Sequence, residues 1–335
     1  MRSSTIYDVA QAAGVATSTV SRAFSNPDRV GAATREHVLE VARRLGYQPN
    51  PHARALVSRR TRTVAMVVSD ITNPHFFELI RGAEMRAKAS GYTLVLVNAE
   101  ESPRIELEQI HRLTRSVDGF LLAASRQPAE DLLQLAAGHR VVVVNRRVPG
   151  LASVVLEHAE GCRQMVAHLA SLGHDSVVYL AGPRNSWMAA SRWAAIRAAA
   201  AELGLRAQRM GPFAPTVASG GAAADAALTT GATAAIAHND LLAIGVLRRL
   251  ADRGIQVPQD ISVVGFDDIF AADLCTPTLT TLGGAHADVG RAAVEILLNS
   301  MEQPRDHAPE LVVPSELILR RSTGVPGRSR GQRPA

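Results

Sequence analysis

The sequence has few of the residues that define disulfide-rich, metal-binding or membrane proteins. Among its 335 residues there are only two cysteines, Cys162 and Cys275, which are too few for a disulfide framework and lack the Cys/His spacing of a metal site. We expect both to be core residues in a reducing compartment. No apolar run reaches membrane-spanning length, and the N-terminus, with Arg2 and Asp8, lacks the apolar stretch of a secretory signal. The sequence therefore predicts a cytoplasmic protein without a membrane partner.

Motifs of several enzyme classes are also missing. There is no phosphate-binding G-x-x-x-x-G-K-[ST] loop, no dinucleotide fingerprint G-x-G-x-x-G and no H-E-x-x-H metal site. The acidic pair Asp267 and Asp268 follows a predicted strand, but adjacent residues on an extended segment point apart. We therefore expect no catalytic residues, no metal and no cofactor.

The sequence does contain enough apolar residues, 47%, for more than one core, and its positive charge is concentrated at its two ends. Residues 1–62 carry ten arginines against four acidic residues, a net charge of +6. Residues 63–321 have a net charge of −4, and the tail 322–335 adds three arginines and no acidic residue. A basic segment is often only a solvated surface, but it is also the electrostatic footprint of a DNA-binding domain.

The basic N-terminal segment shows three short helical patterns. In IYDVAQAAG (6–14) the apolar residues follow the i, i+3, i+4, i+7 spacing of one helix face, and the glycine ends the helix. A second helix is expected over TSTVSRAF (17–24), and a third from about Ala32 to a stop at Gly46. Three small helices around one core make a helix-turn-helix domain, although a helical cap or an oligomerisation module has the same pattern.

The second helix carries a polar outer face. Thr17, Ser18, Ser21 and Arg22 face outward when Val20 faces the core. Hydroxyl and guanidinium groups read base edges in the major groove, and an arginine reaches guanine acceptors. The next segment, residues 47–63, has two prolines, a short helical run and an arginine-rich exit. These features favour DNA binding over a cap or an oligomerisation module.

From Thr63 onward the sequence is typical of an α/β protein. Buried parallel strands are predicted in two series, with helical patterns between them, and this favours two doubly wound lobes over one large sheet. The strands are expected within 63–71, 92–100, 117–125 and 140–148, and then within 175–183, 233–240 and 260–268. Ligand groups lie at the carboxyl ends of such strands, and here these ends are polar. They carry Asp70, Asn73, Asn98, Asn145, Arg146, Asn239, Asp240, Asp267 and Asp268. The pattern predicts a cleft between the lobes.

Seven stretches, in this order, resemble the lactose-repressor (LacI/GalR) family of bacterial transcription regulators, and the resemblance covers nearly the whole chain. They are TIYDVAQAAGVATSTVSR (5–22), TREHVLEVARRLGYQPNPHARAL (34–56), DITNPHFFELIRG (70–82), SVDGFLLA (116–123), SLGHDSVVYLAGP (171–183), HNDLLAIG (238–245) and VPQDISVVGFDD (257–268). The family's fold would be a helix-turn-helix head, a hinge helix and a two-lobed domain like the periplasmic binding proteins.

The resemblance implies a division of the chain. Residues 1–48 would be the DNA-binding domain, 49–61 the hinge helix and linker, and 62–335 the effector-binding and dimerisation domain. Lobe one would comprise about 62–160 and 287–318. Lobe two would comprise about 161–286 and 319–330, and 322–335 would form a basic tail.

The resemblance also implies that the second helix enters the major groove, where Thr17, Ser18 and Arg22 would read bases. Leu56 matches an apolar wedge that opens a base step in the minor groove, and its packing on the ligand domain is the alternative. The predicted DNA-contacting residues are Thr5, Tyr7, Thr17, Ser18, Ser21, Arg22, Thr34, Tyr47, Asn50, Ala53 and Leu56. The partner would be palindromic operator DNA, read by a homodimer.

Three positions depart from the family pattern. Ala16 and Gly31 stand where the family usually has serine, so the second helix loses a favourable N-cap and its capping would pass to Thr17. Gly284 stands where a glutamine is common, so one polar wall of the cleft is missing. These changes make the operator sequence and the effector less predictable.

The effector implied by the resemblance is a small sugar or sugar-like molecule in the cleft. Arg192 and Asp267 would hydrogen-bond to vicinal hydroxyls, and Phe76 or Trp187 would stack on a ring face. Alternatives are an interlobe salt bridge for Arg192 and helix capping for His75. The predicted effector-binding residues are Asp70, Asn73, His75, Phe76, Arg146, Trp187, Arg192, Asn239 and Asp267.

The predicted function is a repressor whose operator affinity the effector controls through closure of the cleft. The alternative is a solute-binding or sugar-modifying protein with an unrelated N-terminal helical module.

Overall fold

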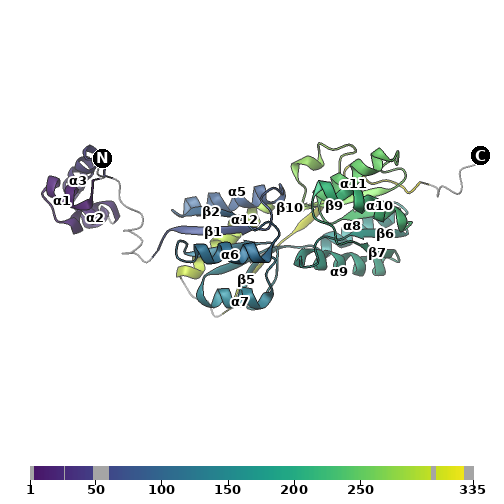
Figure 1. Cartoon of the computed structure of the whole chain (residues 1–335), viewed down its shortest axis with the longest axis horizontal. Helices are drawn as coiled ribbons and strands as arrows, with labels where there is room; N and C mark the ends of the chain where they lie inside the picture. The colour runs from purple at the N-terminus through teal and green to yellow at the C-terminus, as the bar shows by residue number, and fades with distance from the viewer. Residues whose placement is uncertain (1–3, 26, 48–59, 303–306, 328–335) are drawn as a thin grey trace, which may run out of the picture. The chain divides into compact units, whose positions relative to one another are not determined.

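The computed structural model describes residues 4–25, 27–47, 60–302 and 307–327 and divides the chain into two compact units, Met1–Arg62 and Thr63–Ala335 (Figure 1). We call them the head and the body. The predicted contacts of Asn50, Ala53 and Leu56, and most of the predicted hinge, lie outside the described residues. In the part of the chain that is described, no helix is both long enough and apolar enough to cross a membrane.

The head is a three-helix domain, as predicted. Its helices are α1 (Ile6–Ala13), α2 (Thr17–Ser25) and α3 (Ala32–Arg44), with the 3₁₀ turn η1 (Pro27–Arg29) between the last two. Gly14 ends α1 in the left-handed conformation, with φ of 65°. Small apolar side chains from all three helices form its core: Val9, Ala10, Ala13, Val20, Ala23, Val38, Val41 and Ala42.

The three head helices begin differently. At α1, the Thr5 hydroxyl accepts a hydrogen bond from the Asp8 N–H, and the Asp8 carboxylate accepts one from the Thr5 N–H at 2.7 Å, which is a capping box. Before α2, the carbonyl of Ala16 accepts hydrogen bonds from the N–H groups of residues 19 and 20, but its methyl group cannot cap. Gly31 precedes α3 and makes no side-chain cap. Ala16 and Gly31, which stand where the family usually has serine, therefore provide no side-chain cap for α2 and α3.

The body contains two six-stranded sheets with the same strand order. In lobe one the order is β11 (Glu310–Val313), β5 (Ala152–Leu156), β4 (Val141–Val144), β3 (Gly119–Ala123), β1 (Thr63–Val68) and β2 (Thr93–Asn98). In lobe two it is β12 (Ser315–Ile318), β10 (Thr280–Gly284), β9 (Ser262–Phe266), β8 (Ala234–Ala237), β6 (Ser176–Leu180) and β7 (Arg206–Met210). All strand pairs are parallel except β12 with β10, which is antiparallel.

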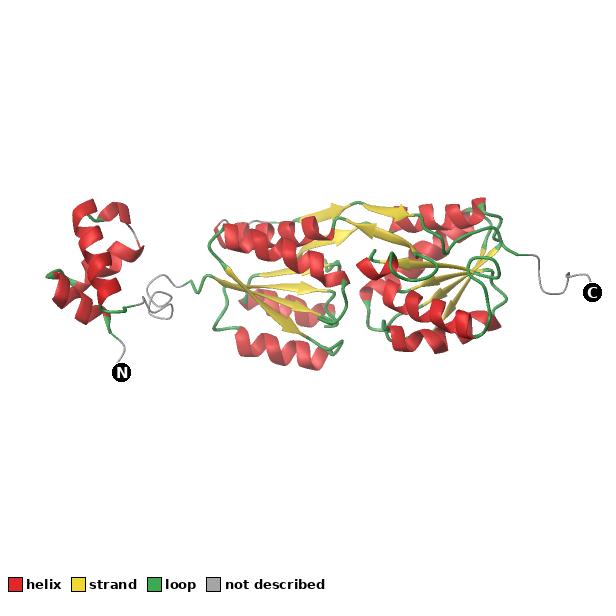
Figure 2. Cartoon of the chain, turned by 90° about the horizontal axis from the view of Figure 1, so that it is seen from above, coloured by secondary structure: helices red, strands yellow, loops and turns green. Residues whose placement is uncertain are grey.

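Helices cover both faces of each sheet, as Figure 2 shows, and this is why the central strands are almost entirely apolar. Lobe one has α5 (His75–Ala89), α6 (Pro103–Leu113), α7 (Ala129–Gly138) and α12 (His286–Glu302). Lobe two has α8 (Ala159–Ser171), α9 (Trp187–Glu202), α10 (Gly220–Thr229) and α11 (Asp240–Asp252), with 3₁₀ turns η2 (Val217–Ser219) and η3 (Phe270–Ala272).

The chain crosses between the lobes three times. It crosses between β5 and α8 at residues 157–158, between β10 and α12 at residue 285, and between β11 and β12 at Pro314. The third crossing corrects the lobe boundary that we expected at residue 318, because β12 belongs to the sheet of lobe two. Proline has no N–H for a strand ladder, so a strand that reaches Pro314 ends there readily.

Candidate functional site

The polar face predicted on α2 lies at the surface of the head. Ser18, Ser21 and Arg22 are exposed and Thr17 is half-buried, whereas Val20 is fully buried in the head core. The amphipathic pattern therefore places these polar groups where a ligand outside the protein can contact them.

Other predicted DNA-contacting residues lie on the same small domain. Thr5, Tyr7 and Thr34 are exposed. Tyr47 is half-buried because its ring packs edge-on against Phe24, with ring centroids 5.9 Å apart.

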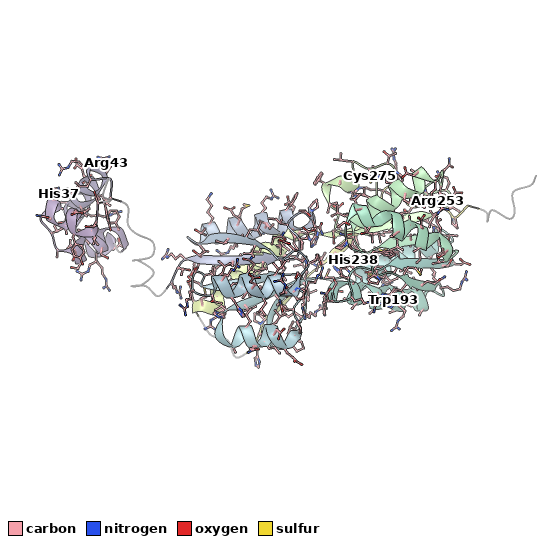
Figure 3. The ribbon with its side chains drawn as sticks, in the orientation of Figure 1. His37, Arg43, Trp193, His238, Arg253 and Cys275 are labelled. Atoms are coloured by element: carbon pink, nitrogen blue, oxygen red, sulfur yellow. The ribbon has the colours of Figure 1, made fainter. Side chains whose placement is uncertain are left out.

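A cavity of about 400 Å³, its open mouth included, lies where the carboxyl ends of strands from both sheets meet. Lobe one contributes Ser69, Asn73, His75, Phe76, Glu101, Ala124, Arg126 and Asn145, and lobe two contributes Ser186, Met188, Arg192, Pro215, His238, Asn239 and Asp267. Figure 3 shows His238 on the side of lobe two that faces lobe one.

Six predicted effector residues line this cavity: Asn73, His75, Phe76, Arg192, Asn239 and Asp267. Asp70, Arg146 and Trp187 do not line it, and their effector contacts stay predictions. The Asp70 carboxylate instead accepts hydrogen bonds from the N–H and hydroxyl of Thr72, at 2.9 and 2.7 Å. The Arg146 guanidinium turns back onto the carbonyl oxygens of residues 125 and 127. Trp187 is half-buried at the start of α9, and its neighbour Met188 lines the cavity.

An ion pair between Arg192 of α9 and Asp267 after β9 dominates the wall of lobe two. A terminal nitrogen of Arg192 donates to Asp267 Oδ1 at 2.8 Å, and the two side chains are only 4% and 6% exposed. Arg192 also donates to the carbonyl of His238, and its guanidinium lies 4.2 Å from the ring centroid of Phe266. Since both members belong to lobe two, the interlobe salt bridge considered for Arg192 is wrong.

The Asp267 carboxyl stays ionised although it is buried. Burial alone would raise the pKa of Asp267. The electrostatic effects of His75, Arg192 and His286 lower it by more than burial raises it, so the net pKa lies below that of an ordinary aspartate.

Lobe one contributes its own ion pair. Arg126 donates to Glu101 through Nε at 2.7 Å, and its Nη2 lies 2.6 Å from the same carboxylate oxygen. The buried Glu106 fixes the loop by accepting the Arg126 N–H at 2.9 Å. Burial raises the pKa of Glu106. Sequence reasoning missed Arg126 and Glu101 although each directly follows a predicted strand, because neither stands in a stretch that resembles the family.

Several residues at the cavity adopt a left-handed backbone that side chains other than glycine rarely take. Glu101, Ala124, Asn145 and Asp267 have φ of 56°, 53°, 55° and 104°. Asp268 has φ of 48°, so the pair Asp267–Asp268 is not on an extended segment as predicted. The two carboxylates nevertheless have different partners, Arg192 for Asp267 and Arg320 for Asp268. Such strain costs about 1–3 kcal/mol at each position and is concentrated at functional sites.

The arrangement is suited to binding a polar molecule. Charged donors and acceptors from both lobes face one space, and Phe76 provides an apolar surface. No group of three or more His, Cys, Asp or Glu residues that could hold a metal ion occurs in the described ranges.

Comparison with known proteins gives a consistent assignment. Residues 5–50 match the model of the bacterial regulatory proteins, lacI family, and residues 166–323 match the periplasmic binding protein-like domain. The HTH-type transcriptional repressor CytR of Escherichia coli strain K12 is 33% identical over 332 residues, which are 95% of this chain and 96% of CytR. The HTH-type transcriptional regulator DegA of Bacillus subtilis strain 168 is 32% identical over 329 residues, 95% and 98% of the two chains.

Solved structures show the same architecture. The lac repressor dimer bound to operator and the anti-inducer ONPF has a TM-score of 0.86 at 27% identity, covering 96% of this chain and all of the repressor chain (100%). The transcriptional regulator CelR in complex with cellobiose has a TM-score of 0.72 at 28% identity, covering 95% and 99%. With its head, its two-lobed body and full-length relatives of this similarity, the chain belongs to the lacI family of bacterial regulatory proteins.

Proposed function

We propose that this protein is a dimeric transcriptional repressor that binds palindromic operator DNA through its head and is controlled by a small sugar-like effector in the body cavity. The observation that carries the proposal is the buried Arg192–Asp267 pair at the wall of an interlobe cavity, in a chain that also has an exposed polar helix on its head.

The head supports sequence-specific DNA binding. Ser18 and Arg22 lie exposed on α2, and hydroxyl and guanidinium groups are the usual readers of base edges. A single helix of this length reads only a few base pairs, so two copies on a palindrome are needed for specificity. Among the relatives, the lac repressor was solved as a dimer on its operator.

The cavity supports a polyhydroxylated effector. Of the described contacts of the Asp267 carboxylate, those with Arg192 and His75 both involve Oδ1, which leaves Oδ2 to accept hydrogen bonds from hydroxyl groups. Phe76, a buried residue at the cavity wall, adds an aromatic ring to the lining. Relatives in this family have been solved with cellobiose and with ribose.

The predicted link between the two activities is closure of the cleft around the effector. Closure changes operator affinity only if the effector binds the closed and open forms differently. The predicted hinge, with Leu56 as its wedge, would carry this change to the DNA.

Deleting residues 1–58 tests the DNA-binding assignment. The full-length chain should bind a palindromic site with an affinity that falls steeply with salt, as fluorescence anisotropy measures, because phosphate contacts release counterions. The deletion should abolish binding and leave the body folded. Unaltered DNA binding would overturn the assignment.

Titration with a panel of sugars and nucleosides, followed by operator binding with each hit, tests the effector assignment. A sugar that binds and changes operator affinity supports the proposal. A sugar that binds without any effect on DNA, or that is chemically converted, supports the solute-binding or sugar-modifying alternative.

Replacing Leu56 tests the predicted wedge. Leu56→Ala should weaken binding to the operator more than binding to random DNA, because only specific binding uses the opened base step. Equal losses on both DNAs would contradict the role.

A further inference from the structure

Three histidines converge on the ion pair of the cavity from three separate segments. His75 begins α5 of lobe one, His158 lies in the first crossing between the lobes, and His286 begins α12 after the second crossing. All three side chains are buried. The predicted site included only His75, and only as an effector contact or a helix cap. Pro74 is the residue at the cap position of α5, so the capping alternative is wrong.

Each histidine contacts a different atom of the Arg192–Asp267 pair. His75 Nδ1 lies 3.5 Å from Asp267 Oδ1, and His286 Nε2 lies 3.0 Å from the Asp267 carbonyl oxygen. His158 Nε2 lies 3.4 Å from a terminal nitrogen of Arg192. The contacts of His75 and His286 join lobe one to lobe two, and the rings of these two histidines also pack edge-on at 4.6 Å. The histidines therefore hold the ion pair of one lobe against the other lobe.

The partners of two of these rings favour their neutral forms. The amide nitrogen of Asn145 lies 3.2 Å from His75 Nε2, and the Arg192 guanidinium faces His158 Nε2. Amide and guanidinium nitrogens only donate hydrogen bonds, so each Nε2 accepts one and the ring proton lies on Nδ1. In His75, that Nδ1–H faces the Asp267 carboxylate. A second proton, on Nε2, would place two N–H groups against each other and break the contact.

The surrounding groups add to this constraint. Arg192, Asp267 and His286 are the titratable groups that act on His75. Arg192, Asp267, His75, His238 and the backbone of residue 157 act on His158. Burial dominates in both cases, and the attraction of Asp267 only partly offsets it. The pKa of His75 is lowered from 6.5 to about 4, and that of His158 from 6.5 to about 3.

We propose that His75 and His158 are positioning residues of the cavity: while neutral they hold the Arg192–Asp267 pair in the closed cleft, and their protonation favours the open cleft. This inference rests on the proposed role of the cavity as the effector site, because it makes effector binding depend on pH. It concerns histidines that touch the ion pair and does not require that they touch the effector.

The sign of the effect follows from comparing the two forms of the cleft. With the lobes in contact through His75 and Asp267, His75 has a pKa of about 4, whereas a ring that opening exposes to water returns to the ordinary value of 6.5. Opening therefore takes up a proton, and acid favours the open form between about pH 6.5 and pH 4. At pH 5.5 the open-to-closed ratio should rise about tenfold through His75, whose contact with Asp267 joins the lobes, and by less through His158, whose contacts with Arg192 and Phe266 lie on the side of lobe two. Above pH 7 the effect should vanish.

The test measures the distance between the lobes in the full-length protein without DNA or effector. Spin labels are placed on Glu130→Cys of α7 and Glu202→Cys of α9, two exposed positions in different lobes, with Cys275→Ser to prevent labelling there. Double electron–electron resonance is recorded on samples frozen from pH 7.5, 6.5, 5.5 and 5. The longer-distance population should grow as the pH falls.

Matched variants decide whether the histidines cause the change. The double variant His75→Asn/His158→Asn should lose the pH response, His158→Asn should keep about a tenfold change at pH 5.5, and His75→Asn should keep a smaller one. His111→Asn, on the exposed side of α6, should behave as the parent. Lobe distances that stay constant from pH 7.5 to 5 in the parent protein, or an unchanged response in the folded double variant, would overturn the inference. Operator binding is measured separately, so its absence would contradict the proposed function without affecting this result.

Discussion

The head and the body place their functional side chains in opposite environments. In the head, Ser18 and Arg22 are exposed on α2 and lie over a core of small apolar residues. In the body, Arg192 and Asp267 are almost completely buried and form an ion pair with each other. Substituting an exposed binding residue lowers affinity and has little effect on stability. Removing one partner of a buried ion pair lowers stability as well, because the other charge is left buried and unpaired. The same type of substitution should therefore have different consequences in the two units.

Arg192→Ala should have the largest effect. It leaves the Asp267 carboxylate buried without its main partner, which typically costs about 3–5 kcal/mol of stability. Urea unfolding measures the loss, and effector response should disappear while the folded protein still binds operator. The matched control is Arg206→Ala, whose pair with Asp175 is exposed on both sides and should contribute little. Equal stabilities of the two variants would contradict the difference between buried and exposed pairs.

Two adjacent glycines at the start of α10 test how tightly the body is packed. A Cβ on Gly220 would lie 2.1 Å from the backbone carbon of Gly245 in α11, so Gly220→Ala should destabilise by about 1–3 kcal/mol. A Cβ on Gly221 would have no atom within 4 Å, so Gly221→Ala should be neutral or stabilise by up to about 1 kcal/mol. Thermal unfolding of both variants measures the difference, and a stable Gly220→Ala protein would show that the two helices can move apart.

Arg22→Ala should affect binding and leave folding intact. Loss of a base-reading arginine costs about 1–3 kcal/mol of operator affinity and relaxes specificity at one base pair. Anisotropy with operator and with single-base variants measures both effects, and unfolding should be unchanged because Arg22 is exposed. Arg248→Ala, an exposed arginine of the body, is the control for charge. A large loss of stability in Arg22→Ala would contradict the separation between surface function and core in the head.

The smallest effects are expected at the two uncapped helix starts. Ala16→Ser restores a capping hydroxyl before α2 and should stabilise the head by about 1 kcal/mol, whereas Gly31→Ser before α3 should add only a few tenths. Hydrogen exchange of amides in the head measures both. A larger gain at Gly31 than at Ala16 would contradict the capping explanation.

Sequence reasoning located the parts of the site that local pattern determines. The head helices end where Gly14 and the apolar spacing predict. Asn239 and Asp267, which line the cavity, were predicted from their positions at strand ends, whereas Arg192 was implied by the family resemblance. The direction of a side chain after a strand is not determined locally. Arg146 turns toward carbonyl oxygens of a neighbouring loop, which no spacing in its own segment reveals.

The missed strands and histidines have a different cause. Five strands were not predicted: β5, β7, β10, β11 and β12. β7 reads RAQRM, which has no apolar run, and β11 and β12 are edge strands with little burial, so these three lack the continuous apolar run of a buried parallel strand. His158 and His286 approach the ion pair because they lie at crossings between the lobes. The position of a crossing follows from the order of strands in two sheets, and this order is a property of the whole fold.

The three crossings have consequences for proteolysis and for the exchange of gene segments between relatives. A protease that cleaves at one crossing, for instance beside Pro314, leaves the lobes joined by two other connections, so the nicked protein should keep its native size and separate into fragments only on a denaturing gel. For the same reason no single contiguous stretch of the gene encodes either lobe. One contiguous gene segment therefore cannot exchange a complete lobe between relatives. A new effector preference has to come from substitutions among the residues that line the cavity.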